Sequence, residues 1–153
     1  MKASQFKSLH HISYTVSDIE RSVAFYRDVM GFTLLHVVHR KHLPSYDAIL
    51  GHKDIELRIA AFEIPRTNLT LELMQFIRPK PVARPQDFLY IATSHVAYRV
   101  DDIEAEYRRI KSAGGDFVSA PAEIHRDGKY IGKAVFLKDP DGILIEPMEL
   151  AKS

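Results

Sequence analysis

The sequence predicts an α+β fold built from two related modules, each a strand, a helix and three further strands. Segment 11–31 recurs 84 residues later as segment 95–115, with seven identities among 21 positions. Each copy opens with alternating apolar and polar residues, which is typical of a strand with one face on a core. Each copy then changes to helical spacing and ends at a glycine, the residue that favours a helix C-terminus. The internal repeat therefore predicts the same order of elements twice.

The composition is that of a globular protein of one domain, which we assign to residues 1–153. The chain has 46% hydrophobic and 27% charged residues, and its formal net charge is +1. A near-neutral chain has no overall attraction to nucleic acid or anionic lipid, so we expect neither as a partner. The chain contains no cysteine, which excludes disulfides, thiolate metal sites and a cysteine nucleophile. Because no apolar run approaches the roughly 20 residues that span a bilayer, and no secretion signal is recognisable, we expect a cytoplasmic protein.

The first module is expected over residues 9–77. Ser17 and Glu20 have the spacing of a capping box, which predicts that a helix begins there and continues to Gly31. Residues 40–55 form a longer insert for which the pattern predicts no element. The further strands of this module are expected at Thr33–His39, Glu56–Glu63 and Leu69–Ile77.

The second module is expected over residues 94–150, after a linker at 78–93 that begins with a proline-rich stretch. Asp101 occupies the predicted helix cap, and the turn sequence Asp139–Gly142 precedes the last strand. Pro147 in that strand predicts an edge position, because proline cannot donate a ladder hydrogen bond. The further strands are expected at Phe117–Ala120, Lys133–Lys138 and Ile143–Glu149.

Each module offers one histidine near its start and one glutamate near its end on the same predicted face. His11 and His95 point away from the apolar faces of their strands. Glu72 lies opposite Leu71 and Leu73 in its strand, and Glu146 lies opposite its apolar neighbour Ile145 in the same way. All four side chains therefore project from the face that the helices leave free.

These residue types are suited to binding a divalent metal. A buried carboxylate is costly unless it is paired or bound to a metal. Two imidazoles and two carboxylates form a nitrogen and oxygen donor set for Ni, Co, Zn, Mn or Fe. Each residue alone could be an ordinary strand residue facing solvent; their recurrence in both copies favours the metal site. Such a metal polarises a carbonyl and stabilises the enediolate that forms when a neighbouring proton leaves.

At these residues the sequence resembles the vicinal-oxygen-chelate superfamily, which includes glyoxalase I, extradiol dioxygenases and bleomycin-resistance proteins. The resemblance lies in segments 11–32 and 136–146 and covers about residues 9–150. It implies a glyoxalase-like fold, in which paired βαβββ modules form a curved mixed sheet around a metal cleft. It also implies a homodimer. The ligand positions of the family correspond to His11, Glu72, His95 and Glu146, with His10 as the less favoured alternative to His11.

The ligand set resembles that of bacterial-type glyoxalase I. This implies a metal-dependent lyase or isomerase that moves a proton beside a carbonyl of a small substrate with adjacent oxygens. Glu72 and Glu146 are both candidates for the catalytic base, and the choice between them stays open. Arg99 shares the strand face of His95 and is our first candidate for holding an anionic substrate group. Further acid–base candidates are His39, His42, Tyr46, His125 and Tyr130.

Two alternatives use the same scaffold. A ring-cleaving extradiol dioxygenase would use His11, His95 and Glu146, and Glu72 would be dispensable. A non-enzymatic protein that binds a small molecule or an antibiotic would need none of the four. The segment before His95 lacks the glycine-rich character of glyoxalase I, which weakens lactoylglutathione as the specific substrate.

Overall fold

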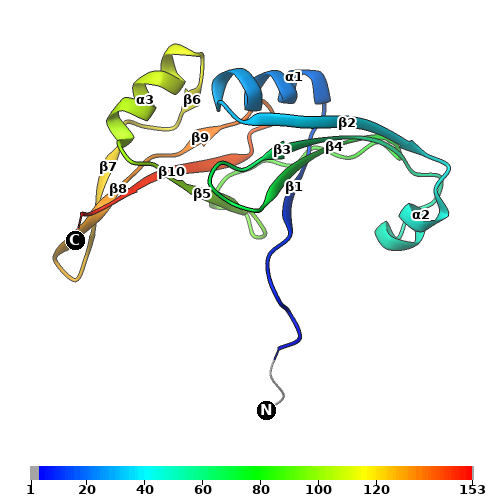
Figure 1. Cartoon of the computed structure of the whole chain (residues 1–153), viewed down its shortest axis with the longest axis horizontal. Coiled ribbons are helices and arrows are strands. Elements are labelled where there is room, and N and C mark those ends of the chain that lie inside the picture. The colour runs from blue at the N-terminus through cyan, green and yellow to red at the C-terminus, as the bar shows by residue number, and fades with distance from the viewer. Residues whose placement is uncertain (1–3, 153) are drawn as a thin grey trace. The chain divides into compact units, whose positions relative to one another are not determined.

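The structure is a computed structural model that describes residues 4–152, and it divides into two compact units (Figure 1). Unit 1 comprises Met1–Arg27 and Gly31–Pro81, and unit 2 comprises Asp28–Met30 and Val82–Ser153. Each unit contains one sheet and at least one helix. The mixed α+β architecture predicted from the repeat is confirmed.

The sheet of unit 1 has four strands in the order β1-β4-β3-β2. The inner strand β4 pairs in parallel with β1 and antiparallel with β3. One sheet face buries apolar side chains such as Leu71, Leu73 and Phe62, and helix α1 contacts β3 and β4. The strand bounds are β1 His11–Thr15, β2 Thr33–Lys41, β3 Glu56–Glu63 and β4 Thr70–Arg78.

The first helix begins one residue later than the capping box predicts. Helix α1 (Ile19–Ala24) is capped by Asp18, whose carboxylate accepts a hydrogen bond from the Arg21 N–H at 3.0 Å. The Ser17 hydroxyl instead accepts from the Arg21 side chain at 2.9 Å. The π-helical turn η1 (Phe25–Val29) follows directly, and its adjacent aromatic residues Phe25 and Tyr26 are both buried.

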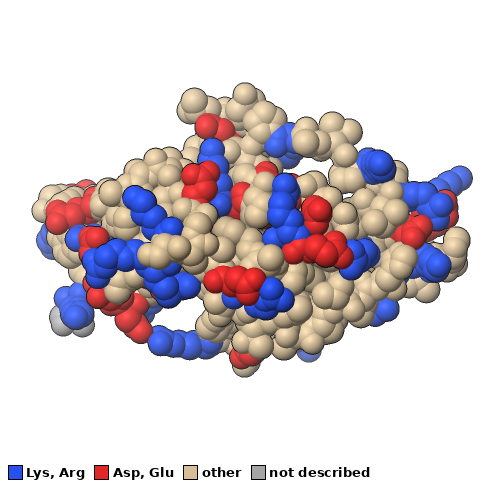
Figure 2. All heavy atoms as spheres, turned by 90° about the horizontal axis from the view of Figure 1, so that it is seen from above, with Lys and Arg blue, Asp and Glu red and all other residues tan. Residues whose placement is uncertain are grey.

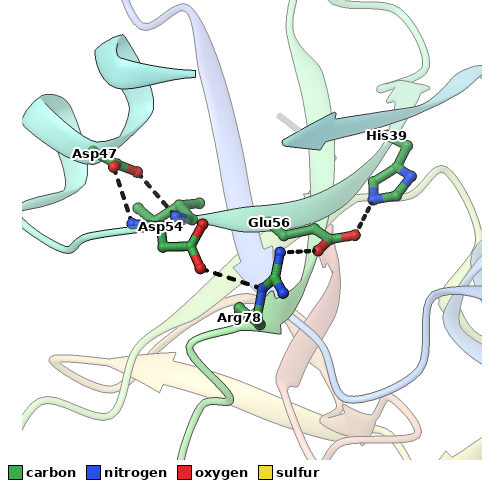
Figure 3. Close-up of polar contacts among 6 residues, drawn as sticks. His39, Asp47, Asp54, Glu56 and Arg78 are labelled. Atoms are coloured by element: carbon green, nitrogen blue, oxygen red, sulfur yellow. Dashed lines mark hydrogen bonds and ion pairs between the residues drawn. The ribbon is translucent and has the colours of Figure 1, made fainter. Parts of the chain in front are cut away.

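The insert at 40–55 contains a short helix, α2 (Pro44–Leu50), that the sequence pattern does not predict. Tyr46 and Leu50 pack against an apolar cluster of Ile55, Leu57 and Ile59 on β3 and just before it. The Asp47 carboxylate accepts hydrogen bonds from the N–H groups of Asp54 at 3.0 Å and of Ile55 at 2.9 Å (Figure 3). Packing therefore holds the insert against the sheet, and the hydrogen bonds to the Asp47 carboxylate close the insert on itself.

Unit 2 repeats the order of elements of unit 1, but the strands equivalent to β2 and β3 are each divided into two. Strand β10 pairs in parallel with β5 and antiparallel with β8 and β9, as β4 pairs with β1 and β3 in unit 1. Strands β6 and β7 in turn pair with β9 and β8. The elements are β5 His95–Arg99, α3 Ile103–Ser112, β6 Asp116–Phe117, β7 Ala122–Arg126, β8 Lys129–Ala134, β9 Leu137–Lys138 and β10 Leu144–Leu150.

Two predictions for the second module are wrong. Helix α3 is capped by Asp102 and not by Asp101, because the Asp102 carboxylate accepts from the Ala105 N–H at 2.9 Å. Pro147 lies inside the sheet and not at an edge. It falls between the part of β10 that pairs with β9 and the part that pairs with β8, where the antiparallel ladder is broken.

The hairpin of β7 and β8 is a further difference from the predicted strands. Its turn residues Asp127 and Gly128 have φ values of 52° and 73°. Two consecutive residues with positive φ are typical of a tight hairpin turn, and Asp-Gly is a strong sequence signal for it. The sequence therefore contains a local signal for this hairpin.

The surface carries both signs of charge. On the face that Figure 2 shows, lysine and arginine side chains lie among aspartates and glutamates. Among residues 4–152, no helix has the length and apolar character needed to cross a membrane.

Candidate functional site

The first pair of candidate ligands lies on neighbouring parallel strands of unit 1. In the pairing of β1 with β4, His11 is opposite Thr70 and Ser13 is opposite Glu72. His11 and Glu72 therefore lie on one sheet face, two residues out of register. The neighbours Leu71 and Leu73 are buried on the other face, so Glu72 projects from the face that α1 does not cover.

His11 and Glu72 are not hydrogen-bonded to each other. The Nδ1 atom of His11 lies 2.9 Å from that of His10, and the two rings meet edge to face with centroids 5.2 Å apart. Glu72 is half-buried on an inner strand and makes no hydrogen bond or ion pair with any of residues 4–152. A half-buried carboxylate without a partner is unfavourable for the fold, so its presence needs a reason outside the fold.

The second pair lies in unit 2 at the same stagger. His95 is opposite Leu144 and Ala97 is opposite Glu146 in the pairing of β5 with β10. Here the structure brings the two side chains together, with His95 Nε2 3.1 Å from Glu146 Oε2. The side chain of His95 is 38% exposed and that of Glu146 is 15% exposed. The imidazole is therefore held against a largely buried carboxylate.

Two phenylalanines that sequence reasoning missed surround His95. The ring centroid of Phe88 lies 5.7 Å from that of His95, and the centroid of Phe136 lies 5.1 Å from it. The two phenylalanine rings are 4.8 Å apart. Phe88 lies in the segment interpreted as an extended linker, and no periodicity there distinguishes it from any exposed residue. Its contact with His95 depends on the path of the loop.

The other candidates lie apart from these pairs. Arg99 is exposed and shares the β5 face with His95, about 13 Å further along the strand. His39 pairs in register with Arg58, whose side chain binds Glu20 of α1, so His39 lies on the helix-covered face of its sheet. His125 contacts the ring of Tyr130, its partner across the β7–β8 hairpin, with centroids 5.7 Å apart.

His39 belongs to a polar cluster of unit 1 that Figure 3 shows. Its Nε2 atom lies 2.8 Å from Glu56 Oε1, and the other Glu56 oxygen is 2.8 Å from Arg78 Nη2. Arg78 Nε also lies 3.6 Å from the carboxylate of Asp54. Arg78 is paired with the carboxylates of both Glu56 and Asp54, and these contacts join the end of the insert to the end of β4.

The candidate ligands therefore occur as one histidine and one glutamate in each unit. Among residues 4–152, no group of three or more histidine, aspartate or glutamate side chains is placed to hold a metal. The chemistry of each pair, one imidazole nitrogen and one carboxylate, nevertheless fits the donor preferences of divalent transition metals. Glu72 in particular has its carboxylate oxygens available to a ligand.

Two groups with a shifted pKa, Arg109 and Lys133, are not among the candidate ligands. The hydrogen bond between Arg109 and Glu106 raises the pKa of the arginine. The hydrogen bond from Lys133 to Glu104 raises the pKa of the lysine in the same way. Both are ion pairs beside α3 and neither involves a candidate ligand.

Comparison with known families agrees with this plan. The model of the Glyoxalase/Bleomycin resistance protein/Dioxygenase superfamily matches residues 8–146. The chain belongs to this superfamily. A crystal structure of a glyoxalase family protein from Bacillus cereus superposes on this superfamily member with a TM-score of 0.81, at 18% identity and 99% coverage of both chains. That likeness shows the fold alone, and it confirms the expected glyoxalase-like fold class.

Among curated relatives, the chain is 31% identical to the uncharacterized protein YaeR of Escherichia coli (strain K12), covering 94% of this chain and 96% of YaeR. It is 30% identical to a probable lactoylglutathione lyase of Vibrio parahaemolyticus, covering 89% of this chain and 86% of that protein. It is 27% identical to a 2-epi-5-epi-valiolone epimerase of an Actinomyces species, covering 94% and 79% of the two chains. The superfamily thus includes similar proteins that are named for different activities.

Proposed function

We propose that this protein is a divalent-metal-dependent lyase or isomerase of the glyoxalase type, with a small substrate that carries adjacent oxygens. One observation carries the proposal: a His–Glu pair recurs at the same stagger on the equivalent parallel strands of both modules. The proposed ligands are His11, Glu72, His95 and Glu146. Relatives named lactoylglutathione lyase and epimerase support an enzyme of this general kind.

The four residues would divide the work between holding the metal and moving a proton. A bound divalent metal would supply Lewis acidity at the substrate oxygens. Glu146 Oε2 lies 3.1 Å from His95 Nε2, which places these two ligand groups side by side. Glu72 is free of such a partner among the described residues, so it is the carboxylate we assign as the base that takes the substrate proton. Arg99 would hold an anionic group of the substrate.

Metal content by elemental analysis tests the proposal, with the protein measured as purified, after chelation and after refilling. We expect about one divalent ion per chain in the wild type and strongly reduced content in Glu72→Gln and Glu146→Gln. Glu63→Gln is the matched control, because Glu63 is an exposed β3 carboxylate on the same sheet face as Glu72 and its replacement changes the net charge equally.

The outcomes separate the proposed enzyme from its alternatives. Metal that is retained in Glu72→Gln but lost in Glu146→Gln would contradict a four-ligand site and favour the dioxygenase, for which oxygen uptake with a catechol is the assay. Absence of metal under all conditions would contradict the metalloenzyme and favour a small-molecule-binding protein. Turnover assays for proton exchange beside a carbonyl then follow with the metal-loaded wild type.

A further inference from the structure

Three aromatic rings form a closed group in unit 2, and His95 is one of them. The rings of His95, Phe88 and Phe136 all meet edge to face, with interplanar angles of 75°, 86° and 69°. In this arrangement the positive edge of one ring lies on the negative face of the next, which fixes relative orientation as well as distance. We call Phe88 and Phe136 the aromatic wall.

The loop that carries Phe88 is held in place by its own polar groups. The Asp87 carboxylate accepts a hydrogen bond from the Leu89 N–H at 2.9 Å. The Asp87 carbonyl accepts from the Thr93 hydroxyl at 2.7 Å and from the Tyr90 N–H at 3.0 Å. These bonds close the loop from both sides of Phe88. The aromatic wall is therefore formed before any ligand arrives, which lowers the entropic cost of binding.

The aromatic wall is apolar, partly open and specific to the second module. Phe88 remains 53% exposed despite its contacts with two rings. The loop between Pro85 and His95 itself contains no lysine or arginine, so the surface beside Phe88 is apolar in its own sequence. The equivalent histidine of the first module, His11, has the polar ring of His10 as its neighbour. Within residues 4–152, phenylalanine rings therefore contact His95 and not His11.

We propose that the aromatic wall determines substrate specificity by selecting substrates with a planar apolar group next to the adjacent oxygens. The inference rests on the proposed function, since it takes His95 as a ligand for the metal that the oxygens approach. A planar group placed against Phe88 covers apolar surface that is now in water and adds a further edge-to-face or stacked contact. Small hydrophilic substrates gain neither effect.

Binding of two hydroxamates tests this inference without relying on turnover. Acetohydroxamate and benzohydroxamate present the same pair of adjacent oxygens, and they differ in a methyl against a phenyl group. With metal-loaded wild type, calorimetry should show benzohydroxamate binding about tenfold more tightly, the factor that corresponds to about 1.4 kcal/mol. Phe88→Ala should remove most of this preference and leave the affinity for acetohydroxamate within about twofold. Phe88→Tyr, which keeps the ring, should retain it.

Leu89→Ala is the control for the loop, because Leu89 is 92% exposed and donates its hydrogen bond to Asp87 from the backbone. It should leave both affinities unchanged. Equal affinities in the wild type, or a phenyl preference that survives in Phe88→Ala, would overturn the inference while leaving the metal site intact. Failure of both hydroxamates to bind the metal-loaded protein would overturn the proposed function and this inference with it.

Discussion

Replacing Glu72 with glutamine should stabilise the metal-free protein while destroying its metal binding. Glu72 lies on the inner strand β4 between the fully buried residues Leu71 and Leu73, and it has no hydrogen-bond or ion-pair partner within residues 4–152. A residue retained for its chemistry at the expense of the fold is expected to behave in this way. For a residue that stabilises the fold, the same replacement would lower the stability of the metal-free protein.

The expected gain follows from the environment of the carboxylate. An unsatisfied buried polar group costs about 1–3 kcal/mol, and charged groups cost more. Glu72 is half-buried, so water still reaches part of it, and we take about 1 kcal/mol as the gain from removing the charge. For 153 residues the entropy of unfolding is about 0.3 kcal/mol/K, so the melting temperature should rise by about 3 °C.

Thermal and urea unfolding of chelator-treated protein provides the measurement. Glu63→Gln, which removes an exposed charge on the neighbouring strand, should change the melting temperature by less than about 1 °C. Glu146→Gln should not stabilise, because it removes the negative charge that lies 3.1 Å from His95 Nε2. A fall of about 3 °C or more in metal-free Glu72→Gln would show that Glu72 supports the fold, and our reasoning about this residue would be refuted.

Three further predictions concern stabilisation by metal binding, the packing of a glycine and the pH dependence of an ion pair. Divalent metal at about 100 times its Kd should stabilise the protein by about 2.7 kcal/mol, a rise of about 8 °C that EDTA reverses; an unchanged melting temperature would contradict binding to the folded state. Gly132→Ala should lower the urea midpoint more than Gly128→Ala. Both glycines have a positive φ, but a Cβ at 132 would also lie 2.1 Å from the Glu149 carbonyl oxygen whereas Gly128 has open space; equal effects would contradict this packing. The Glu104 hydrogen bond raises the pKa of Lys133, so its stabilising contribution is complete below the unfolded pKa of about 10.4 and is lost as the pH rises through the higher folded value. The melting-temperature difference between wild type and Lys133→Met should therefore be constant from about pH 7 to 9 and shrink above about pH 11; a difference that grows above that pH would contradict the assigned pairing.

Much of the fold could be predicted because the repeat and the strand patterns are local. The bounds of Glu56–Glu63 agree with β3 at both ends, since its apolar run is ended by charged residues at each side. The helix caps were each wrong by one residue. Two adjacent polar residues stand before each helix, and only the backbone conformation decides which one accepts the hydrogen bond.

The insert and the interrupted strands could not be predicted in the same way. Helix α2 has seven residues, too few for a helix that is stable by its own propensity. It is stabilised by Tyr46 and Leu50 on the β3 cluster and by Asp47 at its base. The contacts with the β3 cluster depend on how the sheet forms. A local sequence pattern therefore does not predict them.

By itself the sequence determined which residue types face away from the helices, because side chains alternate along a strand with a period of two. It thereby identified His11, Glu72, His95 and Glu146 as one repeated set. Only the tertiary structure decided their partners: His10 beside His11, Glu146 and two phenylalanines around His95, and none within the described chain for Glu72. The physical reason is that alternation is a property of a single strand, whereas contacts depend on strand register and on the path of loops such as 87–93, which long-range pairing sets.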